Sequence, residues 1–343
     1  MSYLRPLLIP VAAVLTGLLL LAVGLAALGY DAPLALGALW RSAFGSWYAF
    51  GSATLVRAVP LILIGLGLAV AFRAGGLNIG AEGQFTVGAV GATWMAVQVA
   101  SWPGPLAIVA VALTGCLAGV VWIAVPIWLR LRFGVLEVIS TLLLNFVAEA
   151  VVSFMVHGPL QEASRTYPQS DPIAAAARLP VLPGSRLHLG LLVAVALGLI
   201  FWVLFTRSAW GFRLRAVGES PRASWVSGRI DSPRVLAVAL AIAGGMAGLA
   251  GAFEVSGVTY SLYANLSPGY GFTAIAVALI ARLHPLGVIV AGLGFGALEA
   301  GAAGMQREAG VPAVAVYVVQ AVIIVVALLS VSRTRLLRAE TGG

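Results

Sequence analysis

Apolar stretches long enough to cross a membrane follow one another along almost the whole of this 343-residue chain. A spanning α-helix needs about 20 predominantly apolar residues. Only 9% of the residues are charged and 61% are hydrophobic, whereas a soluble domain has about 25% charged and roughly 45–50% apolar residues. We therefore predict an all-α polytopic membrane helix bundle of about ten transmembrane helices, built as a single transmembrane domain over residues 1–343. The predicted spans are 6–28, 52–72, 80–100, 105–128, 134–156, 187–206, 234–255, 271–281, 286–302 and 312–331.

Two of these stretches need a separate interpretation. The stretch 271–281 is too short to cross a membrane at 1.5 Å per residue. It either begins earlier, near Tyr260, or forms half of a broken helix, and the sequence predicts a short helical hairpin near 271–302.

A cleaved signal peptide is the alternative for the first stretch, 6–28. Its apolar run is longer than the 7–15 residues of a signal-peptide core, and only Arg5 precedes it, so we expect a retained anchor.

The cationic residues exclude several kinds of chemistry. All 20 basic residues are Arg, so the chain has no Lys for a phosphate-binding GxxxxGK[ST] loop or for a Schiff base. If the protein uses ATP, a partner chain must bind it.

The single cysteine, Cys116, excludes internal disulfides and Cys-rich zinc sites. An HExxH motif is absent and the three His residues are scattered, which makes an enzyme the weaker class and predicts neither a metal site nor a cofactor on this chain.

The Arg residues are distributed unevenly between the two sides of the predicted bundle. When the spans alternate from a cytoplasmic N-terminus, 14 Arg residues fall inside, five fall outside and Arg57 lies in or at the edge of the second span. This bias follows the positive-inside rule and predicts that both termini are cytoplasmic. The net charge of +8 is then an orientation signal rather than a nucleic-acid-binding surface. The layout gives an extracytoplasmic loop at 157–186 and a densely charged cytoplasmic loop at 207–233.

Polar side chains recur every four residues in the fifth predicted span. At 3.6 residues per turn, neighbouring members of such a row share a face of the helix. Polar groups in spans usually face the bundle interior or a water-filled path. We therefore favour the wall of a translocation path, with interhelical hydrogen bonding as the alternative. The row consists of Glu137, Thr141, Asn145, Glu149, Ser153 and His157.

A second polar set interrupts the apolar pattern at 75–84, where four Gly residues accompany Asn78, Glu82 and Gln84. Such a segment is unsuited to a regular helix facing lipid. It suits a non-helical or re-entrant break enclosed by protein, where freed backbone groups and polar side chains can meet a solute. A plain cytoplasmic turn after Arg73 is the alternative.

Several runs of the sequence together resemble one family. The chain is similar to permease subunits of ABC importers, in the branch that serves branched-chain amino acids, ribose-type sugars and nucleosides, and it is most similar to the nucleoside-type permeases. The likeness extends from about Arg57 to Gly301. It departs from the family at Ser220, Ser224 and Arg229, where Asn, Ala and an apolar residue are usual. The matching runs are 75–84 (GGLNIGAEGQ), 137–145 (EVISTLLLN), 157–160 (HGPL), 167–170 (YPQS), 216–223 (AVGESPRA) and 267–279 (SPGYGFTAIAVAL).

The resemblance implies a multi-pass permease of the bacterial cytoplasmic membrane that moves a small polar solute by alternating access, with a nucleoside as the first candidate. It implies partner subunits that bind ATP, a second permease subunit of the same or a sister kind, an extracytoplasmic solute-binding protein and surrounding lipid. A permease for a simple sugar or a branched-chain amino acid, or a proton-driven secondary transporter, is the alternative. The segment implied to dock on the ATPase contains Glu219, Ser220, Pro221, Arg222, Ala223 and Gly228.

Overall fold

The computed structural model describes residues 17–228 and 230–312, together with 314, 317, 318 and 321. The chain divides into two compact units, one formed by residues 58–295 and the other by residues 1–57 and 296–343, and each unit is described by itself. Within the described residues, six helices are long and apolar enough to cross a membrane. The all-α membrane bundle is thus confirmed, while the count of ten spans stays a prediction. The six are Trp47–Arg73, Gly104–Phe133, Glu137–Val156, Gly190–Arg207, Ser232–Thr259 and Pro285–Ala309.

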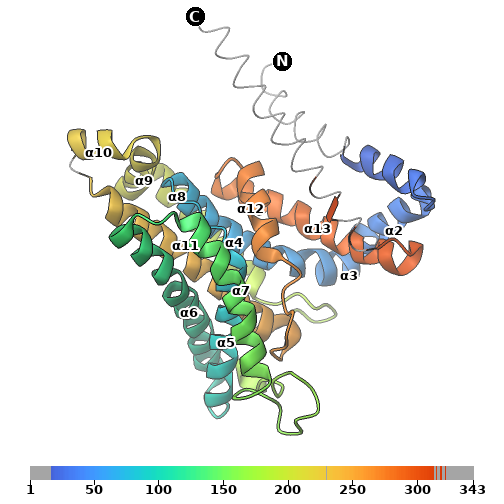
Figure 1. Cartoon of the computed structure of the whole chain (residues 1–343). Helices are drawn as coiled ribbons and strands as arrows, with labels where there is room; N and C mark the ends of the chain where they lie inside the picture. Colours follow the sequence, from blue (N-terminus) through green and yellow to red (C-terminus); the bar gives the residue numbers. More distant parts are fainter. Residues whose placement is uncertain (1–16, 229, 313, 315–316, 319–320, 322–343) are drawn as a thin grey trace, which may run out of the picture. The chain divides into compact units, whose positions relative to one another are not determined.

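Four long helices lie side by side in the larger unit: α5 (Ala81–Gln98), α6 (Gly104–Phe133), α7 (Glu137–Val156) and α11 (Ser232–Glu254) (Figure 1). Small residues let α6 and α11 approach closely. A Cβ atom added to Gly119 of α6 would lie 2.1 Å from the carbonyl oxygen of Gly244 in α11. Glycines at these positions of α6 and α11 therefore serve close helix packing.

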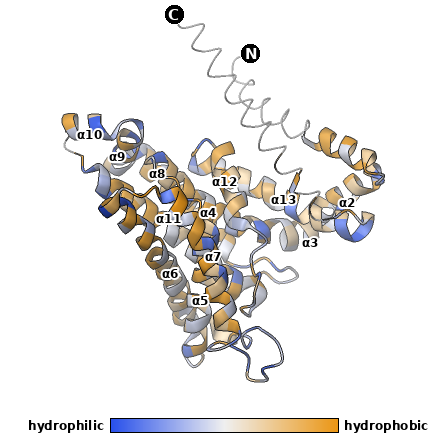
Figure 2. Cartoon of the chain, in the orientation of Figure 1, coloured by the Kyte–Doolittle hydropathy of each residue, from blue (hydrophilic) through white to orange (hydrophobic). Residues whose placement is uncertain are grey.

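The helices of this unit differ in how much surface they leave exposed. The central helix α4 (Val56–Arg73) continues directly from the π-helical turn η1 (Phe50–Leu55), and most of its apolar residues are fully buried. A helix that is apolar on all sides belongs in the middle of a bundle. The helix α6 instead exposes a row of apolar side chains, and the long helices are largely coloured as hydrophobic in Figure 2. The exposed row includes Leu106, Leu113, Leu117 and Val121.

The chain between α4 and α5 is not helical. The helix α4 ends at Arg73, the turn at Gly75 has a φ of +82°, and α5 begins at Ala81. A left-handed backbone of this kind suits glycine, which has no Cβ atom to clash. The sequence predicted a break near 75–84, and the structure places it at 74–80. Glu82 and Gln84 therefore lie in the first turn of α5 rather than in the break.

The loop predicted at 207–233 contains two helices. The helix α9 (Ala209–Glu219) continues almost directly from α8 (Gly190–Arg207), and α10 (Pro221–Gly228) follows after Ser220. The sequence predicted no helix at 209–219, so α9 is an addition to the predicted loop. Ser208 explains why α9 starts where it does, because its hydroxyl oxygen accepts a hydrogen bond of 3.1 Å from the Gly211 N–H.

The predicted hairpin near 271–302 is present with a longer second helix. The helix α12 (Tyr270–Ile280) has 11 residues, so it does not begin earlier near Tyr260, and at 1.5 Å per residue it is too short to cross a membrane by itself. Arg282 and Leu283 turn the chain with φ values of 52° and 58°. The helix α13 (Pro285–Ala309) then continues seven residues beyond the predicted end at 302.

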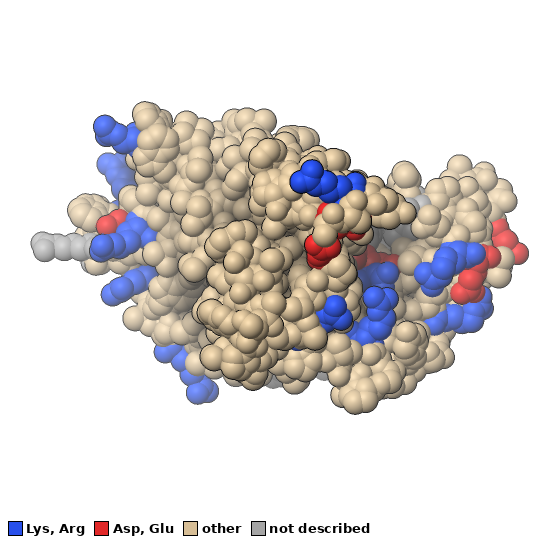
Figure 3. Space-filling model, turned by 90° about the horizontal axis from the view of Figure 1, so that it is seen from below, with Lys and Arg blue, Asp and Glu red and all other residues tan. Residues whose placement is uncertain are grey.

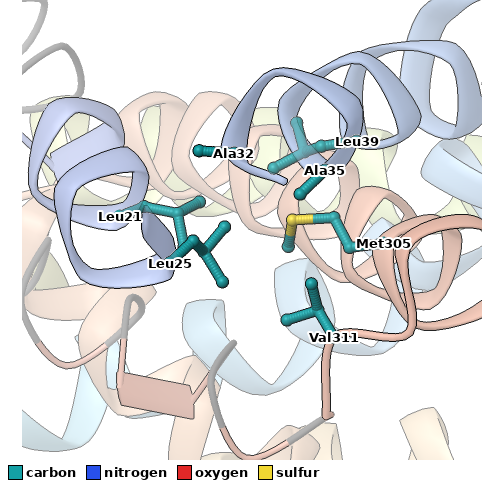
Figure 4. Close-up of a cluster of buried hydrophobic side chains, with 7 residues drawn as sticks. All are labelled: Leu21, Leu25, Ala32, Ala35, Leu39, Met305 and Val311. Carbon is teal, nitrogen blue, oxygen red and sulfur yellow. The ribbon is translucent and has the colours of Figure 1, made fainter. Parts of the chain in front are cut away.

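The smaller unit is built around one apolar cluster, in which side chains from 17–27, α2 (Ala32–Phe44) and the end of α13 point toward one another (Figure 4). An ion pair of 2.7 Å joins Arg41 to Glu308. The helix α2 was not predicted, because its sequence lies between two longer apolar stretches. The first part of the predicted span 6–28 and nearly all of 312–331 lie outside the described residues.

Candidate functional site

The break at 74–80 is held in place by side chains of α7. The Leu77 N–H donates to Glu137 Oε1 at 3.0 Å, and the Ile79 N–H donates to Thr141 Oγ1 at 3.3 Å. These bonds supply partners that a helical ladder would otherwise have provided. The first members of the polar row in the fifth predicted span thus contact the predicted break directly.

Asn145 of α7 makes two hydrogen bonds to this region. Its Oδ1 accepts from the Gly83 N–H at 2.8 Å, and its Nδ2 donates to the Ile79 carbonyl at 3.1 Å. The side chain is only 4% exposed. One amide therefore joins the end of the break to the first turn of α5, because its oxygen accepts one hydrogen bond and its nitrogen donates the other.

Glu137 is a buried charge with a partner. It lies at the first position of α7, is 2% exposed, and forms an ion pair with Arg130 near the end of α6. Gly134, with a φ of +69°, ends α6 in a left-handed cap and turns the chain between the two charges. A buried carboxylate needs both a counter-charge and hydrogen-bond donors, and Arg130 and the Leu77 N–H provide them.

Asn78 and Gln84 bind each other. The amide nitrogen of Asn78 donates to Gln84 Oε1 at 2.8 Å, and that of Gln84 donates to Asn78 Oδ1 at 3.0 Å. Asn78 Oδ1 also accepts from the Gly80 N–H at 2.9 Å. Both side chains are almost completely buried, so this pair fixes the break to the start of α5.

Glu82 joins α5 to the beginning of α12. Its Oε2 accepts a 2.6 Å hydrogen bond from the Gly271 N–H, and Ser267 also hydrogen-bonds to its side chain. A Cβ atom on Gly271 would lie 2.2 Å from the Glu82 backbone nitrogen, so only glycine allows this approach. A carboxylate at the N-terminus of a helix interacts favourably with the helix dipole.

Six of the seven predicted pathway residues therefore converge on one buried region. Asn78, Glu82 and Gln84 meet the α7 residues Glu137, Thr141 and Asn145 around the break. The seventh, Glu149, is exposed about one turn beyond Asn145 on α7. Many of the polar atoms in this region bind the protein's own backbone. Contact with a solute stays a prediction for all seven residues.

The predicted docking segment forms a capped, exposed helix. The Ala223 N–H donates to Ser220 Oγ at 3.2 Å, which caps the start of α10. Ser224, one of the departures from the family pattern, is buried and donates to the Ser220 carbonyl at 2.9 Å, so it supports the same turn. Glu219, Pro221 and Arg222 are exposed. Arg229, another departure, lies outside the described residues.

An open pocket of about 540 Å³ lies beside α10, lined in part by Phe212, Glu219, Ser220 and Gly228. Trp225 and Val226 project from α10 with 61% and 77% of their surfaces exposed. The end of the molecule that carries α9 and α10 also shows several Arg side chains and few acids in Figure 3. The exposed basic residues of α8 to α10 include Arg207, Arg213, Arg215 and Arg222.

The helix α9 contacts the turn that precedes the break. A Cβ atom on Gly218 would lie 2.1 Å from the carbonyl oxygen of Arg73. The Arg73 guanidinium lies 5.0 Å from the centre of the Phe205 ring, and Arg215 Nη1 donates to the Phe205 carbonyl at 2.5 Å. The sequence does not predict these contacts, because its pattern identifies Arg73 and Arg215 only as charges at the membrane edge and Gly218 only as part of the matching run 216–223.

The predicted outer loop at 157–186 is ordered by Glu162. Its carboxylate accepts hydrogen bonds from Ser164 Oγ at 2.6 Å, Gln169 Nε2 at 2.8 Å and the Tyr167 N–H at 2.9 Å. These donors stabilise the charged form and hold the pKa of Glu162 below its usual value. The loop therefore has a defined conformation that is held by internal hydrogen bonds.

The outer loop is also tied to the chain after α11. The Ser170 N–H donates to the Leu262 carbonyl and the Ile173 N–H to the Tyr260 carbonyl, both at 2.8 Å. Arg178 lies over the Tyr260 ring, 4.8 Å from its centre. The chain that leads into α12 is thus held by the outer loop on one side and by Glu82 on the other.

Comparisons with known proteins agree with this architecture. Residues 51–328 match the family model described as branched-chain amino acid transport system / permease component. The chain is 38% identical over 326 residues to the glucose ABC transporter permease of Haloferax volcanii, covering 92% of this chain and 85% of the relative. It is 35% identical over 325 residues to the guanosine ABC transporter permease of Bacillus subtilis, covering 94% and 92%.

A third relative, the nucleoside ABC transporter permease of Lactococcus lactis, is 34% identical over 330 residues, which cover 93% of this chain and 90% of the relative. No solved structure matches the chain. The family model covers most of the sequence and three relatives exceed 30% identity over nearly their whole lengths. The chain therefore belongs to the branched-chain amino acid transport system permease family and is a multi-pass ABC transporter permease.

Proposed function

We propose that this permease imports a nucleoside across the bacterial cytoplasmic membrane by alternating access. The observation that carries the proposal is the buried amide and carboxylate set around the break, combined with relatives named for guanosine and nucleosides. A nucleoside presents hydrogen-bonding groups on its base and ribose, and Asn, Gln and Glu suit such groups when the break rearranges.

The charge of the site favours a solute without negative charge. Glu82 already occupies the N-terminus of α12, where the helix dipole would otherwise attract an anion. Glu149 on α7 adds a second carboxylate close enough to interact with Glu82. Both acids repel an anionic solute, so a neutral nucleoside or sugar fits this region better than a phosphorylated one.

The energy for transport comes from partner subunits in this proposal. The chain has no Lys for a phosphate-binding loop, and ATP is bound by cytoplasmic subunits that dock on α9 and α10. A second permease subunit completes the pathway, and an extracytoplasmic solute-binding protein delivers the solute at the loop 157–186. This assignment places α9 and α10 in the cytoplasm, as the Arg distribution predicts.

Reconstitution of the complete complex in proteoliposomes tests the proposal. The permease is combined with its ATPase subunits and its binding protein, and ATP hydrolysis and uptake of radiolabelled guanosine are measured. We expect guanosine-loaded binding protein to stimulate both, while binding protein without ligand stimulates neither. Unchanged hydrolysis and uptake across a panel of purine and pyrimidine nucleosides would contradict the nucleoside assignment.

Glucose is the second candidate solute, because the relative with 38% identity is named for it. The same vesicles distinguish the two candidates when labelled glucose replaces guanosine. A branched-chain amino acid can be tested in the same way. A proton-driven mechanism predicts that uptake continues without ATP and stops when the proton gradient is collapsed, whereas our proposal predicts the reverse.

A further inference from the structure

We infer that residues 73–80 transmit movement of the docking helices to the buried polar region, and that Gly218 is the positioning residue for this step. The inference rests on the proposed function, since it concerns how that function is coupled to ATP. The helices α9 and α10 carry the proposed docking surface, yet among the described residues neither contributes a side chain to the polar region around the break. Some intermediate element must connect them.

On the docking side, Gly218 of α9 rests on the turn after α4. A Cβ atom at this position would meet the Arg73 carbonyl oxygen at 2.1 Å, and the Gly218 Cα lies 3.7 Å from the Cβ that Gly75 would carry. Two glycines thus bring two backbones into direct contact. A displacement of α9 toward the turn has no flexible side chain to absorb it.

The helix α9 is itself fixed to α8, so it does not act as a loose tether. Arg215 binds the Phe205 carbonyl at 2.5 Å, and a Cβ atom on Gly211 would lie 2.5 Å from the Leu204 carbonyl oxygen. The Arg73 guanidinium lies over the Phe205 ring, 5.0 Å from its centre. Force applied to α9 is therefore passed to the Arg73 turn.

On the pathway side, residues 77–80 depend on α7 for their hydrogen bonds. The Leu77 and Ile79 N–H groups bind Glu137 and Thr141, and the Ile79 carbonyl binds Asn145. A helix would resist a local shift through its own ladder, whereas this segment can shift by exchanging side-chain partners. Movement at 73–75 thus reaches the buried polar set within a few residues.

Substitution of Gly218 by Ala tests the inference, with Gly294→Ala as the matched control. A Cβ atom at Gly294 meets no atom within 4 Å, so the control adds the same methyl group without a contact. Hydrogen exchange is first measured on the purified full chain in detergent. We expect the peptide covering 74–84 to exchange about tenfold faster in Gly218→Ala and at the wild-type rate in Gly294→Ala.

The second measurement uses the complete complex. We expect Gly218→Ala to assemble with its ATPase and retain basal hydrolysis, but to lose both solute-dependent stimulation and uptake. A purely structural role for Gly218 predicts that assembly and basal hydrolysis fall together with uptake. Wild-type exchange at 74–84, or normal stimulation in a variant with altered exchange, would overturn the inference.

Thr141→Val keeps the inference testable if Gly218→Ala does not fold. This variant removes the acceptor of the Ile79 N–H without changing the side-chain shape, and it leaves α9 untouched. Since coupling between two sites is reciprocal, exchange at the end of α9 should rise when α7 releases the segment. Unchanged exchange at 212–220 would refute the connection.

The inference and the proposed function fail in different ways. Failure of the wild-type complex to respond to any solute refutes the proposed function and leaves the inference standing, because the exchange measurements need no solute.

Discussion

Asn145 shows how one side chain in the bundle can serve two backbone groups. It binds the Gly83 N–H and the Ile79 carbonyl while almost fully buried. The sequence placed Asn145 on a polar face of the correct helix. Spacing alone could not say whether its partner was a solute, a side chain of a neighbouring helix or a backbone group. The hydrogen bonds to backbone explain why a residue of this type is needed even when no solute is present.

Replacing Asn145 by Ala should destabilise the protein. The change leaves the buried Gly83 N–H and the half-buried Ile79 carbonyl without their Asn145 partner, and an unsatisfied buried group costs about 1–3 kcal/mol. Thermal unfolding in detergent, followed by intrinsic tryptophan fluorescence, measures the effect. Ser153→Ala, on an exposed position of the same helix, is the control and should leave the unfolding temperature nearly unchanged. Equal unfolding temperatures for both variants would contradict the assigned role.

His188 predicts a pH dependence of stability. The residue lies just before α8, and burial lowers its pKa from 6.5 to about 4. The folded state therefore binds fewer protons than the unfolded state between these values, so stability falls as the pH falls from 6.5 to 4. The contribution lost by pH 4 is about 3 kcal/mol.

The contribution of His188 is isolated by comparison with His188→Asn, which cannot titrate in this range. The difference in unfolding free energy between the wild type and the variant should change steadily between pH 6.5 and pH 4. Carboxylates such as Glu162 titrate in both proteins and cancel in the difference. A pH-independent difference would show that the His188 ring is accessible to protons in the folded state.

At the scale of elements, α12 depends on one close approach to α5. Gly271→Ala would place a methyl group 2.2 Å from the Glu82 backbone nitrogen and force α12 away from its carboxylate partner. We expect uptake in proteoliposomes to be abolished, with Gly294→Ala as the control. Retention of full uptake would mean that the Glu82–Gly271 contact is not needed for transport.

The helix α10 carries a separate prediction. Glu219 and Arg222 flank the cap formed by Ser220 and are exposed, so they are available to a partner. Replacing both by Ala should uncouple ATP hydrolysis from uptake while leaving the permease folded. Circular dichroism checks the fold, and paired hydrolysis and uptake assays check the coupling. Normal uptake in the double variant would remove these two residues from the docking surface.

The hydrophobic pattern predicted most long helices because burial in a bundle or in lipid needs continuous apolar runs. It missed α9, in which Arg213, Arg215 and Glu219 make the composition typical of a solvated loop. It located the start of the break, since glycine-rich residues such as Gly75 and Gly76 do not favour a helix, but it extended the break to 84 although α5 begins at Ala81. It could not reveal the contacts of Gly218, Gly271 and Arg73, because these depend on which elements meet in space.

At the scale of the whole molecule, the orientation can be tested with single cysteines. The only native thiol, Cys116, is replaced by Ser, and Cys is introduced at Ala175 in the outer loop or at Val226 on α10. We expect a membrane-impermeant maleimide to label the first variant in intact cells and the second only after permeabilisation. The opposite pattern would invert the topology and with it the assignment of the docking helices.

The way the break is held also constrains how the protein is made. Leu77, Ile79 and Gly83 precede α7 by about 60 residues, yet their N–H groups bind Glu137, Thr141 and Asn145. During synthesis, α4 and α5 leave the ribosome before these partners exist. Unpaired backbone groups are costly in lipid. The α4–α5 region must therefore stay hydrated or shielded by the insertion machinery until α7 has been synthesised. A chain that stops at Phe133 lacks α7 and cannot supply these hydrogen-bond partners.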